Sequence, residues 1–204
     1  GMEERGQRKH VRPEGPPDKA QRNFTDPDSR IQPTRDGFIA GYNAQIAIDQ
    51  DHQIIIAQRL AGNPADYGAL IPLVDQAKAN LGCALHEVSG DSGFATEANL
   101  QAPAERKIKA YLAPGRAKHG QPHAAGQRRL TGKPLMAAMA KKIRKAGRSS
   151  RYRLRKQVVE PVFGQIKHAR GFRQFLLRGL KNVRAEWSLI RTVHNLCKLA
   201  KAAT

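Results

Sequence analysis

The alternation of apolar and polar residues within 37–114 predicts a series of strands and helices. Residues 42–48 and 52–60 have the composition of strands, and the polar segment 49–51 joins them as a β-hairpin. The second strand contains three consecutive isoleucines, 54–56, which is typical of a strand covered on both faces. We therefore expect this hairpin to lie inside a sheet that is flanked by helices.

Helices and strands alternate after the hairpin. Apolar side chains recur every three or four residues from Leu70 to Leu81, and Gly82 ends this predicted helix. Thr96 has the hydroxyl group that is expected of an N-cap at the start of another helix. The further elements are expected as a strand at 85–89, a helix at 97–105 and a strand at 108–112. A hairpin followed by this alternation predicts an α/β fold with a mixed sheet.

Three more helices are predicted towards the end of the chain, at about 134–145, 151–170 and 183–200. Apolar stripes on the last two indicate that they pack on the sheet. The first 36 residues are rich in Pro, Gly and charged residues and are expected to be irregular. The expected organisation is an arm or linker at 1–36, an α/β core at 37–114, a basic insertion or linker at 115–150 and C-terminal helices at 151–204 that pack on the core.

The charge of the chain is divided unequally between its two parts. The 204 residues carry a net charge of +19. Residues 1–114 hold 13 Lys and Arg against 15 Asp and Glu, whereas residues 115–204 hold 23 against 2. So basic a segment repels itself unless a polyanion binds it, and nucleic acid is the polyanion that it predicts. A solvated basic surface and contact with an anionic membrane surface are the alternatives.

The composition excludes several other classes of protein. The two cysteines, Cys83 and Cys197, are too few for a disulfide framework, and the spacing of Cys and His does not resemble a zinc site. Both cysteines are expected to be small buried groups. The apolar runs are too short to form a membrane-spanning helix. A reduced, cytoplasmic setting is therefore expected.

Two acidic residues occupy unusual positions. Asp91 follows the predicted strand 85–89 and has a glycine within two residues on each side; strand ends are where open α/β sheets bind ligands. The plainer interpretation of Asp91 is a turn residue that caps the next helix. Glu160 is one of two acids in the basic half of the chain. It is either an ion-pair partner of nearby Lys and Arg side chains or a ligand of Mg²⁺ or Mn²⁺ in a site for phosphodiesters.

Several motifs, in order along the chain, resemble those of DDE-type insertion-sequence transposases. They are GFIAGYNAQ at 37–45 with AID at 47–49, GDSGF at 90–94, EPVFGQIK at 160–167, and the closing segment from Arg178 to Leu199. The segment TDPDSR at 25–30 also fits one branch of this family. The resemblance covers roughly residues 21–200 and rests on the order and spacing of the motifs.

The resemblance implies an RNase H-like fold and metal-dependent cleavage and transfer of DNA strands at transposon ends. It implies that Asp91 is the second catalytic Asp, that Glu160 is the catalytic Glu, and that both hold Mg²⁺ or Mn²⁺. Lys167 matches the basic residue that contacts phosphate on the family's Glu helix. The expected DNA-binding side chains are Arg155, Lys156, Lys167, Arg170 and Arg173. DNA in the bacterial nucleoid is the implied partner, and the oligomeric state stays open, a homo-oligomer included.

The sequence departs from the family at the first catalytic Asp. Family members carry it on a central strand before the hairpin, and residues 1–40 contain no apolar run of that kind ending in Asp. Asp26, Asp28 and Asp36 lie in turn-rich sequence, and Asp49 lies at the tip of the hairpin, on the wrong strand. We therefore expect a catalytic-domain fragment whose sheet lacks its first strand and has an open edge. Three hypotheses remain: a transposase fragment that cuts DNA, an inactive remnant that only binds DNA, and a basic nucleic-acid-binding domain unrelated to transposition.

Overall fold

The computed structural model describes residues 21–34, 37–62, 65–115, 130–146, 152 and 155–203. The strands are β1 (Arg30–Thr34), β2 (Gly37–Gly41), β3 (Asn43–Ile48), β4 (Ile55–Ala61), β5 (Glu87–Gly90) and β6 (Lys109–Leu112). The helices are α1 (Leu70–Leu81), α2 (Glu97–Glu105), α4 (Pro134–Ala146), α5 (Arg155–Gly164) and α6 (Leu180–Ala202). A 3₁₀ turn, η1 (Ser92–Phe94), and a π-helical turn, η3 (Gln165–Ala169), complete the described elements.

The described strands pair in twos rather than in one mixed sheet. β3 and β4 form an antiparallel hairpin in which Asn43 lies opposite Ala61, as the apolar pattern predicts. β5 and β6 are parallel, with Glu87 opposite Lys109, and α2 connects them in a βαβ unit. The α/β class is therefore confirmed, whereas the predicted pairing of all strands in one sheet is not seen among the described strands.

A further hairpin begins in the segment 1–36 that was predicted to be irregular, with β1 inside that segment and β2 directly after it. β1 pairs with β2 in antiparallel register, so that Arg30 lies opposite Gly41 and Thr34 opposite Gly37. β1 is largely exposed and contains Pro33, which a strand tolerates at a sheet edge. Because this strand buries little apolar surface, its sequence lacks the alternation that identifies a strand.

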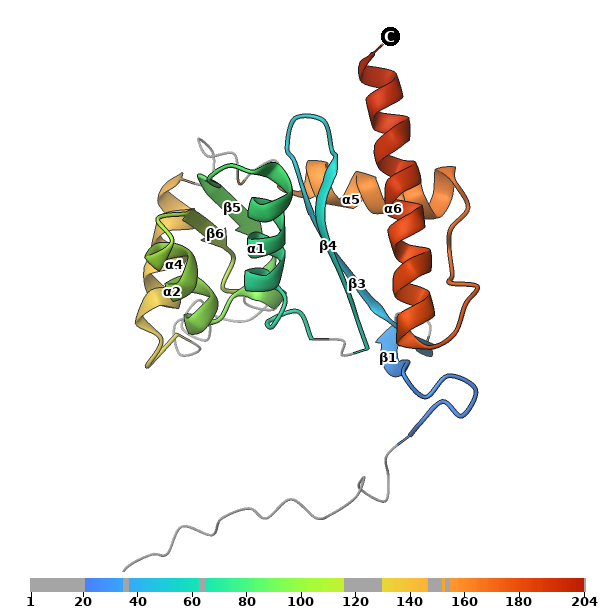
Figure 1. Cartoon of the computed structure of the whole chain (residues 1–204). Helices are drawn as coiled ribbons and strands as arrows, with labels where there is room; N and C mark the ends of the chain where they lie inside the picture. The colour runs from blue at the N-terminus through green and yellow to red at the C-terminus, as the bar shows by residue number, and fades with distance from the viewer. Residues whose placement is uncertain are drawn as a thin grey trace, which may run out of the picture.

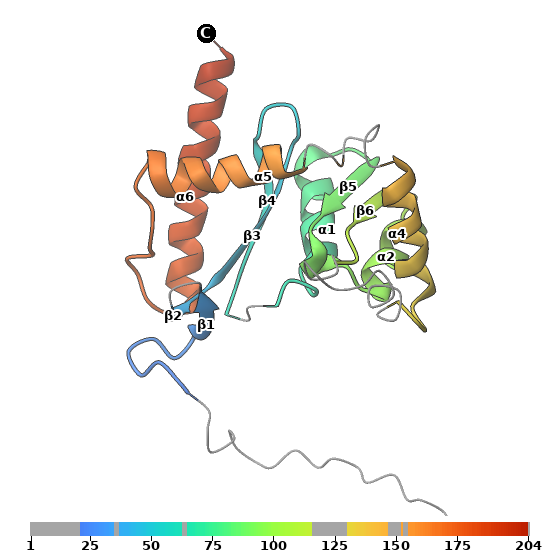
Figure 2. The same ribbon diagram turned by 180° about the vertical axis from the view of Figure 1, so that it is seen from behind.

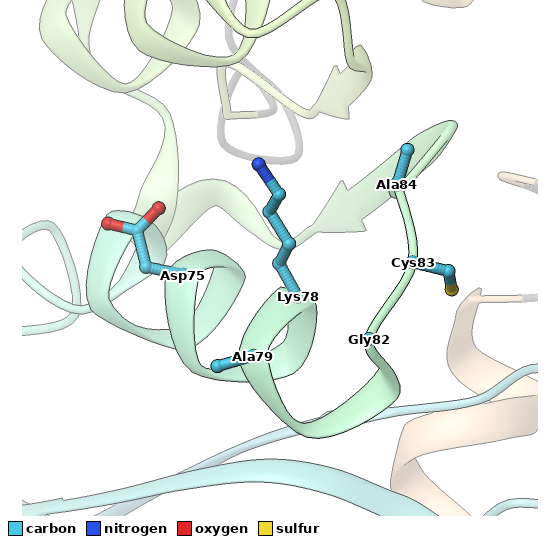
Figure 3. A pocket seen from close by; sticks show the side chains of 6 residues that line it. All are labelled: Asp75, Lys78, Ala79, Gly82, Cys83 and Ala84. Atoms are coloured by element: carbon cyan, nitrogen blue, oxygen red, sulfur yellow. The ribbon is translucent and has the colours of Figure 1, made fainter.

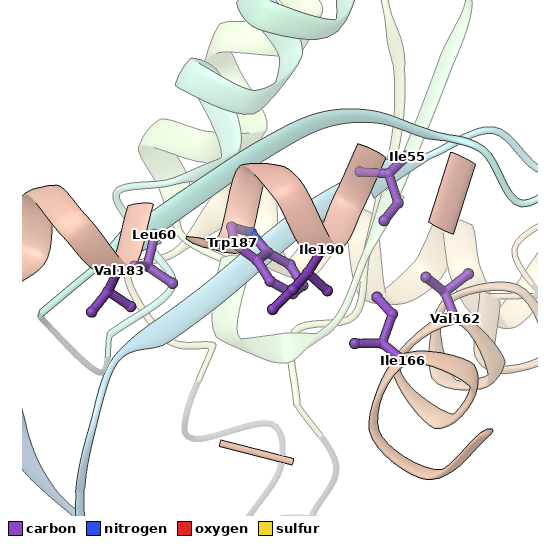
Figure 4. Close-up of a cluster of buried hydrophobic side chains, with 7 residues drawn as sticks. All are labelled: Ile55, Leu60, Val162, Ile166, Val183, Trp187 and Ile190. Atoms are coloured by element: carbon purple, nitrogen blue, oxygen red, sulfur yellow. The ribbon is translucent and has the colours of Figure 1, made fainter. Parts of the chain in front are cut away.

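One core joins the β3–β4 hairpin to the C-terminal helices (Figure 4). Its buried side chains come from β4, α5, η3 and α6: Ile55, Leu60, Val162, Ile166, Val183, Trp187 and Ile190. The ring of Trp187 stacks on Phe163 at 6.3 Å between centroids and meets Phe175 edge-on at 6.2 Å. Such aromatic packing stabilises the core beyond simple area burial. This core holds α5 and α6 against the β3–β4 hairpin.

A second core surrounds the β5–β6 pair. It contains buried side chains of α1, α2, β6 and α4, including Leu70, Leu100, Leu112 and Met139. The other face of α1 packs through Ala69, Leu73 and Ala77 on Ala57 of β4. Helix α1 therefore lies between the hairpin and the β5–β6 pair, as Figures 1 and 2 show from opposite sides.

Local signals fix the ends of two helices where they were predicted. Gly82 follows α1 with a left-handed φ of 64°, and its N–H donates to the carbonyl of Lys78. The hydroxyl of Thr96 accepts a hydrogen bond from Asn99 N at the start of α2. Among the described residues, none of the helices combines the length and the hydropathy that a membrane span requires.

Candidate functional site

Asp91 lies at the carboxyl end of β5. The strand ends at the buried Gly90, where a Cβ atom would come within 2.9 Å of Leu112 Cδ2. Oδ1 of Asp91 then accepts a hydrogen bond of 2.9 Å from Gly93 N, which starts the 3₁₀ turn η1. Asp91 is therefore a turn-capping residue, as its position predicted, and it also presents an exposed carboxylate at a strand end.

A second carboxylate lies beside Asp91, and the sequence did not single it out. Asp66 belongs to the link between β4 and α1, and its Oδ2 approaches Gly93. A Cβ atom added at Gly93 would lie 2.7 Å from Oδ2 of Asp66 and 3.2 Å from Oδ1 of Asp91. The two carboxylates therefore border the same small space, which only a glycine at position 93 leaves open.

Two amide side chains of β3 hold Asp66. Its Oδ1 accepts hydrogen bonds of 2.8 Å from Asn43 Nδ2 and 2.6 Å from Gln45 Nε2. These bonds bring the start of β3 to the end of β5. In the sequence, Asp66 is marked only by its place between a predicted strand and a predicted helix, a place that Asp91 also has. Its partners lie more than 20 residues away in the chain, so sequence spacing gave no hint of them.

Glu160 lies in α5 and is exposed. Among the described side chains it forms no ion pair, since the ion pairs found there join His52 to Asp49 and Arg106 to Asp75. The next residue, Pro161, has no N–H for the helix bond to the Gln157 carbonyl, which instead accepts a 3.4 Å hydrogen bond from Gln53 Nε2. This contact ties α5 to the hairpin near Glu160.

A cleft of about 490 Å³ separates β3 from β5. Its lining is mostly apolar and comes from β3, the hairpin turn, α1, β5 and α5. Gly90 and Val159, the residues that directly precede Asp91 and Glu160, both line it. Among the described strands, β3 pairs only with β4 and β5 only with β6, so each has an unpaired edge.

The predicted DNA-binding residues differ in their surroundings. Lys167 is exposed, with its Nζ 5.8 Å from the centre of the Phe163 ring, and Arg173 is exposed as well. Arg170 is half-buried, and its Nη1 lies 3.1 Å from Nδ1 of His194. Arg155 and Lys156 begin α5, but their side chains lie outside the described residues. Lys167 and Arg173 therefore have the accessibility that binding phosphate requires.

The acids considered for the first catalytic position have other partners. Asp26 is buried and accepts hydrogen bonds from the Tyr42 hydroxyl, at 2.7 and 2.8 Å, and from Gly179 N. Asp28 accepts one from Leu180 N. Asp49 closes its own hairpin turn by accepting hydrogen bonds from the backbone N–H groups of residues 51, 52 and 54. Asp36 lies outside the described residues.

The cysteines are exposed, so the prediction that they are buried is wrong. Cys83 follows Gly82 in the loop after α1, and Cys197 lies on the outer side of α6. Figure 3 shows the shallow hollow beside Cys83, with the thiol pointing away from Asp75 and Lys78. Because Asp75 already pairs with Arg106 at 3.5 Å, this hollow brings no free acids together.

Hard oxygen donors suit Mg²⁺ and Mn²⁺, and the paired carboxylates of Asp66 and Asp91 are of this type. No group of three or more His, Cys, Asp or Glu side chains placed to hold a metal ion occurs in the part of the chain that the structure describes. The end of β5 therefore fits a divalent cation with two carboxylates, and further ligands must come from elsewhere.

Comparison with known protein families matches residues 11–196 to the family described as "Transposase DDE domain". The matched range includes Asp66, Asp91 and Glu160. Comparison with curated proteins and with solved structures gives no match.

Proposed function

Because the chain belongs to the transposase DDE domain family, we propose that it is the part of a DNA transposase that cleaves and joins DNA strands. Membership confirms the resemblance of the motifs and implies DNA transposition, DNA binding and an RNase H-like fold. It excludes the hypothesis of a nucleic-acid-binding domain unrelated to transposition.

In this proposal Asp91 and Glu160 bind divalent cations beside the cleft. Bound cations supply Lewis-acid stabilisation of the attacking and leaving oxygens of a phosphodiester. Asp91 offers its carboxylate from the fixed end of β5, and Glu160 offers its own from α5. The observation that carries the proposal is that the residues directly before both acids line one cleft.

The basic surface of the C-terminal helices is proposed to bind the DNA backbone. α5 continues directly into η3, so Lys167 follows Glu160 by about two helical turns. A phosphate held there lies close to the proposed metal ligands along one helix. Arg173 adds a second exposed cation after η3. Arg170 has five N–H donors, so its contact with His194 leaves donors for a phosphate.

We further propose that the cleft between β3 and β5 receives an extended segment carrying the third acid. The start of β3 and the end of β5 meet at Asp66, so the two strands run in opposite directions along the cleft. A strand parallel to β5 and antiparallel to β3 would pair with both unpaired edges. Its carboxyl end would then reach Asp91.

Nicking of supercoiled plasmid DNA in the presence of Mg²⁺ tests the catalytic proposal. We expect nicking by the parent chain that EDTA abolishes and that Asp91→Ala and Glu160→Ala each reduce to background. Glu105→Ala, which removes an exposed acid at the end of α2 away from the cleft, is the matched control and should nick normally. Nicking that persists in both catalytic variants would show that these acids have no role in cleavage.

An inactive DNA-binding remnant is the second candidate. It is favoured by one observation: the described residues bring no three acids together. Such a protein would bind DNA in a salt-sensitive way and would not nick it with Mg²⁺ or Mn²⁺. The plasmid assay, run beside a DNA-binding assay, therefore separates the two candidates.

A further inference from the structure

We propose that Asp66 is a ligand of the divalent cation at the end of β5, with the buried amide of Gln45 as its neutral neighbour. The proposal rests on the proposed function, in which Asp91 is a metal ligand, and adds a residue that neither the motifs nor the family match assigns a role. Three observations carry it: the shared space at Gly93, an unpaired buried oxygen, and the lack of a basic partner.

The space beside Gly93 is bordered by both carboxylates. Oδ1 of Asp66 is occupied by the hydrogen bonds from Asn43 and Gln45, which leaves Oδ2 directed at Gly93. Asp91 likewise uses Oδ1 for the Gly93 N–H. Asp66 is thus fixed through Oδ1 and turns Oδ2 towards this space, whereas Asp91 borders the space with the same Oδ1 that accepts from Gly93 N. A carboxylate oxygen has two lone pairs, so this hydrogen bond leaves Asp91 Oδ1 able to bind a cation. Hydrogen bonds of this kind orient metal ligands in proteins.

The amide of Gln45 supplies an independent sign of a ligand. Gln45 is 5% exposed, and its Oε1 has no hydrogen-bond partner among the described residues. A buried acceptor without a partner costs about 1–3 kcal/mol. This oxygen belongs to the same amide whose Nε2 lies 2.6 Å from Asp66. A cation beside Asp66, or water bound to that cation, would give Oε1 the partner that it lacks.

The charges near the site also favour a bound cation. Two carboxylates that border one space repel each other unless a cation lies between them. In the described part of the chain, neither Asp66 nor Asp91 forms an ion pair with Lys or Arg, although the chain as a whole carries +19. A metal ion is therefore the counter-charge that the arrangement calls for.

Binding of Mn²⁺ alone, measured by isothermal titration calorimetry and electron paramagnetic resonance, tests this inference. We expect the parent chain to bind Mn²⁺ and Asp66→Asn to bind it at least about tenfold more weakly. Asn keeps an oxygen that accepts from Asn43 and Gln45, so the variant removes the charge and retains the hydrogen bonds. Glu105→Gln is the matched control, since it removes one exposed carboxylate at the end of α2, away from the cleft, and should bind as the parent does.

A second variant keeps both acids and fills the space between them. Gly93→Ala places a methyl group 2.7 Å from Oδ2 of Asp66, so we expect weaker Mn²⁺ binding with both carboxylates present. Gly68→Ala is its control, because a methyl group there meets no atom within 4 Å. Circular dichroism checks that each variant is folded.

The possible results separate this inference from the proposed function. Mn²⁺ binding that is lost in Asp91→Asn but unchanged in Asp66→Asn and in Gly93→Ala would overturn the role of Asp66 and leave the proposed function intact. Equal losses of Mn²⁺ binding in Asp66→Asn and Glu105→Gln would show non-specific attraction of the cation to acidic surface and would also overturn the role of Asp66. A folded parent chain that binds no Mn²⁺ would contradict both the inference and the proposed metal chemistry.

Discussion

Gln53 and His194 join the hairpin to the C-terminal helices. Gln53 has a φ of 60°, which is rare for a residue with a side chain, and its Oε1 accepts hydrogen bonds from Lys198 Nζ at 2.7 Å and Gln165 Nε2 at 3.3 Å. His194 is fully buried; its Nε2 donates to the Gln53 carbonyl, and its Nδ1 accepts from Arg170. These polar contacts set the position of α5, and with it that of Glu160, relative to the hairpin.

Burial lowers the pKa of His194 below its usual value, and the nearby charges of Arg170 and Lys198 lower it further. Above about pH 6.5 the ring is neutral in both the folded and the unfolded chain, so it adds no pH dependence. Below that pH the unfolded chain binds a proton that the folded chain resists. Stability is therefore expected to fall as the pH decreases from about 6.5 towards the lower folded pKa.

Urea denaturation of the parent and His194→Gln between about pH 7 and pH 5 measures this contribution. His194→Gln is less stable throughout because it loses packing, but its free energy of unfolding should fall less over this interval. His168→Gln, which replaces an exposed ring that forms no ion pair among the described residues, is the matched control. Equal slopes for the parent and His194→Gln would contradict the assignment.

At the scale of elements, acidic side chains from segments distant in the sequence cap the starts of helices. The segment 26–28 caps α6: Asp28 accepts from Leu180 N at 2.9 Å, and the buried Asp26 accepts from Gly179 N and the Tyr42 hydroxyl. Burial and the Asp26 carboxylate raise the pKa of Tyr42. The TDPDSR motif thus joins the N-terminal segment to the hairpin and to the last helix.

Removal of these caps should have unequal effects on stability. Asp26→Ala leaves the Tyr42 hydroxyl and the Gly179 N–H without their buried acceptor, so we expect a loss of about 3 kcal/mol. Asp28→Ala removes an exposed cap and should cost about 1 kcal/mol. Urea denaturation measures both, with Asp51→Ala expected within about 0.5 kcal/mol of the parent. An Asp26→Ala variant as stable as the parent would disprove the anchoring role.

A second distant cap connects α2 to α4. The carboxylate of Glu97 accepts hydrogen bonds from Met136 N at 2.8 Å and Leu135 N at 3.2 Å, in the first turn of α4. Glu97→Ala should therefore cost about 1 kcal/mol and increase amide hydrogen exchange in α4. Glu105→Ala, at the other end of α2, is the control and should leave exchange in α4 unchanged. Equal amide hydrogen exchange in α4 of the Glu97→Ala and Glu105→Ala variants would contradict this capping role.

Elements with strong local signals could be predicted, and those that depend on distant partners could not. The hairpin, α1 with Gly82 and α2 with Thr96 follow from apolar spacing and capping residues. β1 depends on pairing with β2, so its own sequence carried little signal. Asp91 and Glu160 stood out by their positions, and the resemblance supplied their catalytic role. Asp66 was passed over because its amide partners and Gly93 are far from it in the chain.

At the scale of the whole molecule, the basic half of the chain predicts DNA binding that weakens steeply with salt. Each phosphate contact releases counterions, so the logarithm of the binding constant falls linearly with that of the salt concentration. Lys167→Ala and Arg173→Ala should each weaken binding and reduce the slope by about 1. Lys78→Ala, an exposed lysine of the near-neutral part, should change neither. Identical slopes for all the variants would contradict the assigned DNA-binding surface.

Fe²⁺ bound in place of Mg²⁺ reports whether Asp91 and Glu160 share one metal centre. With ascorbate and peroxide, bound Fe²⁺ generates radicals that cut the polypeptide backbone near the metal, and mass spectrometry locates the cuts. We expect cuts beside both Asp91 and Glu160, suppressed by excess Mg²⁺ and lost in Asp91→Ala. Cuts beside only one of the two acids, or only at other sites, would contradict it.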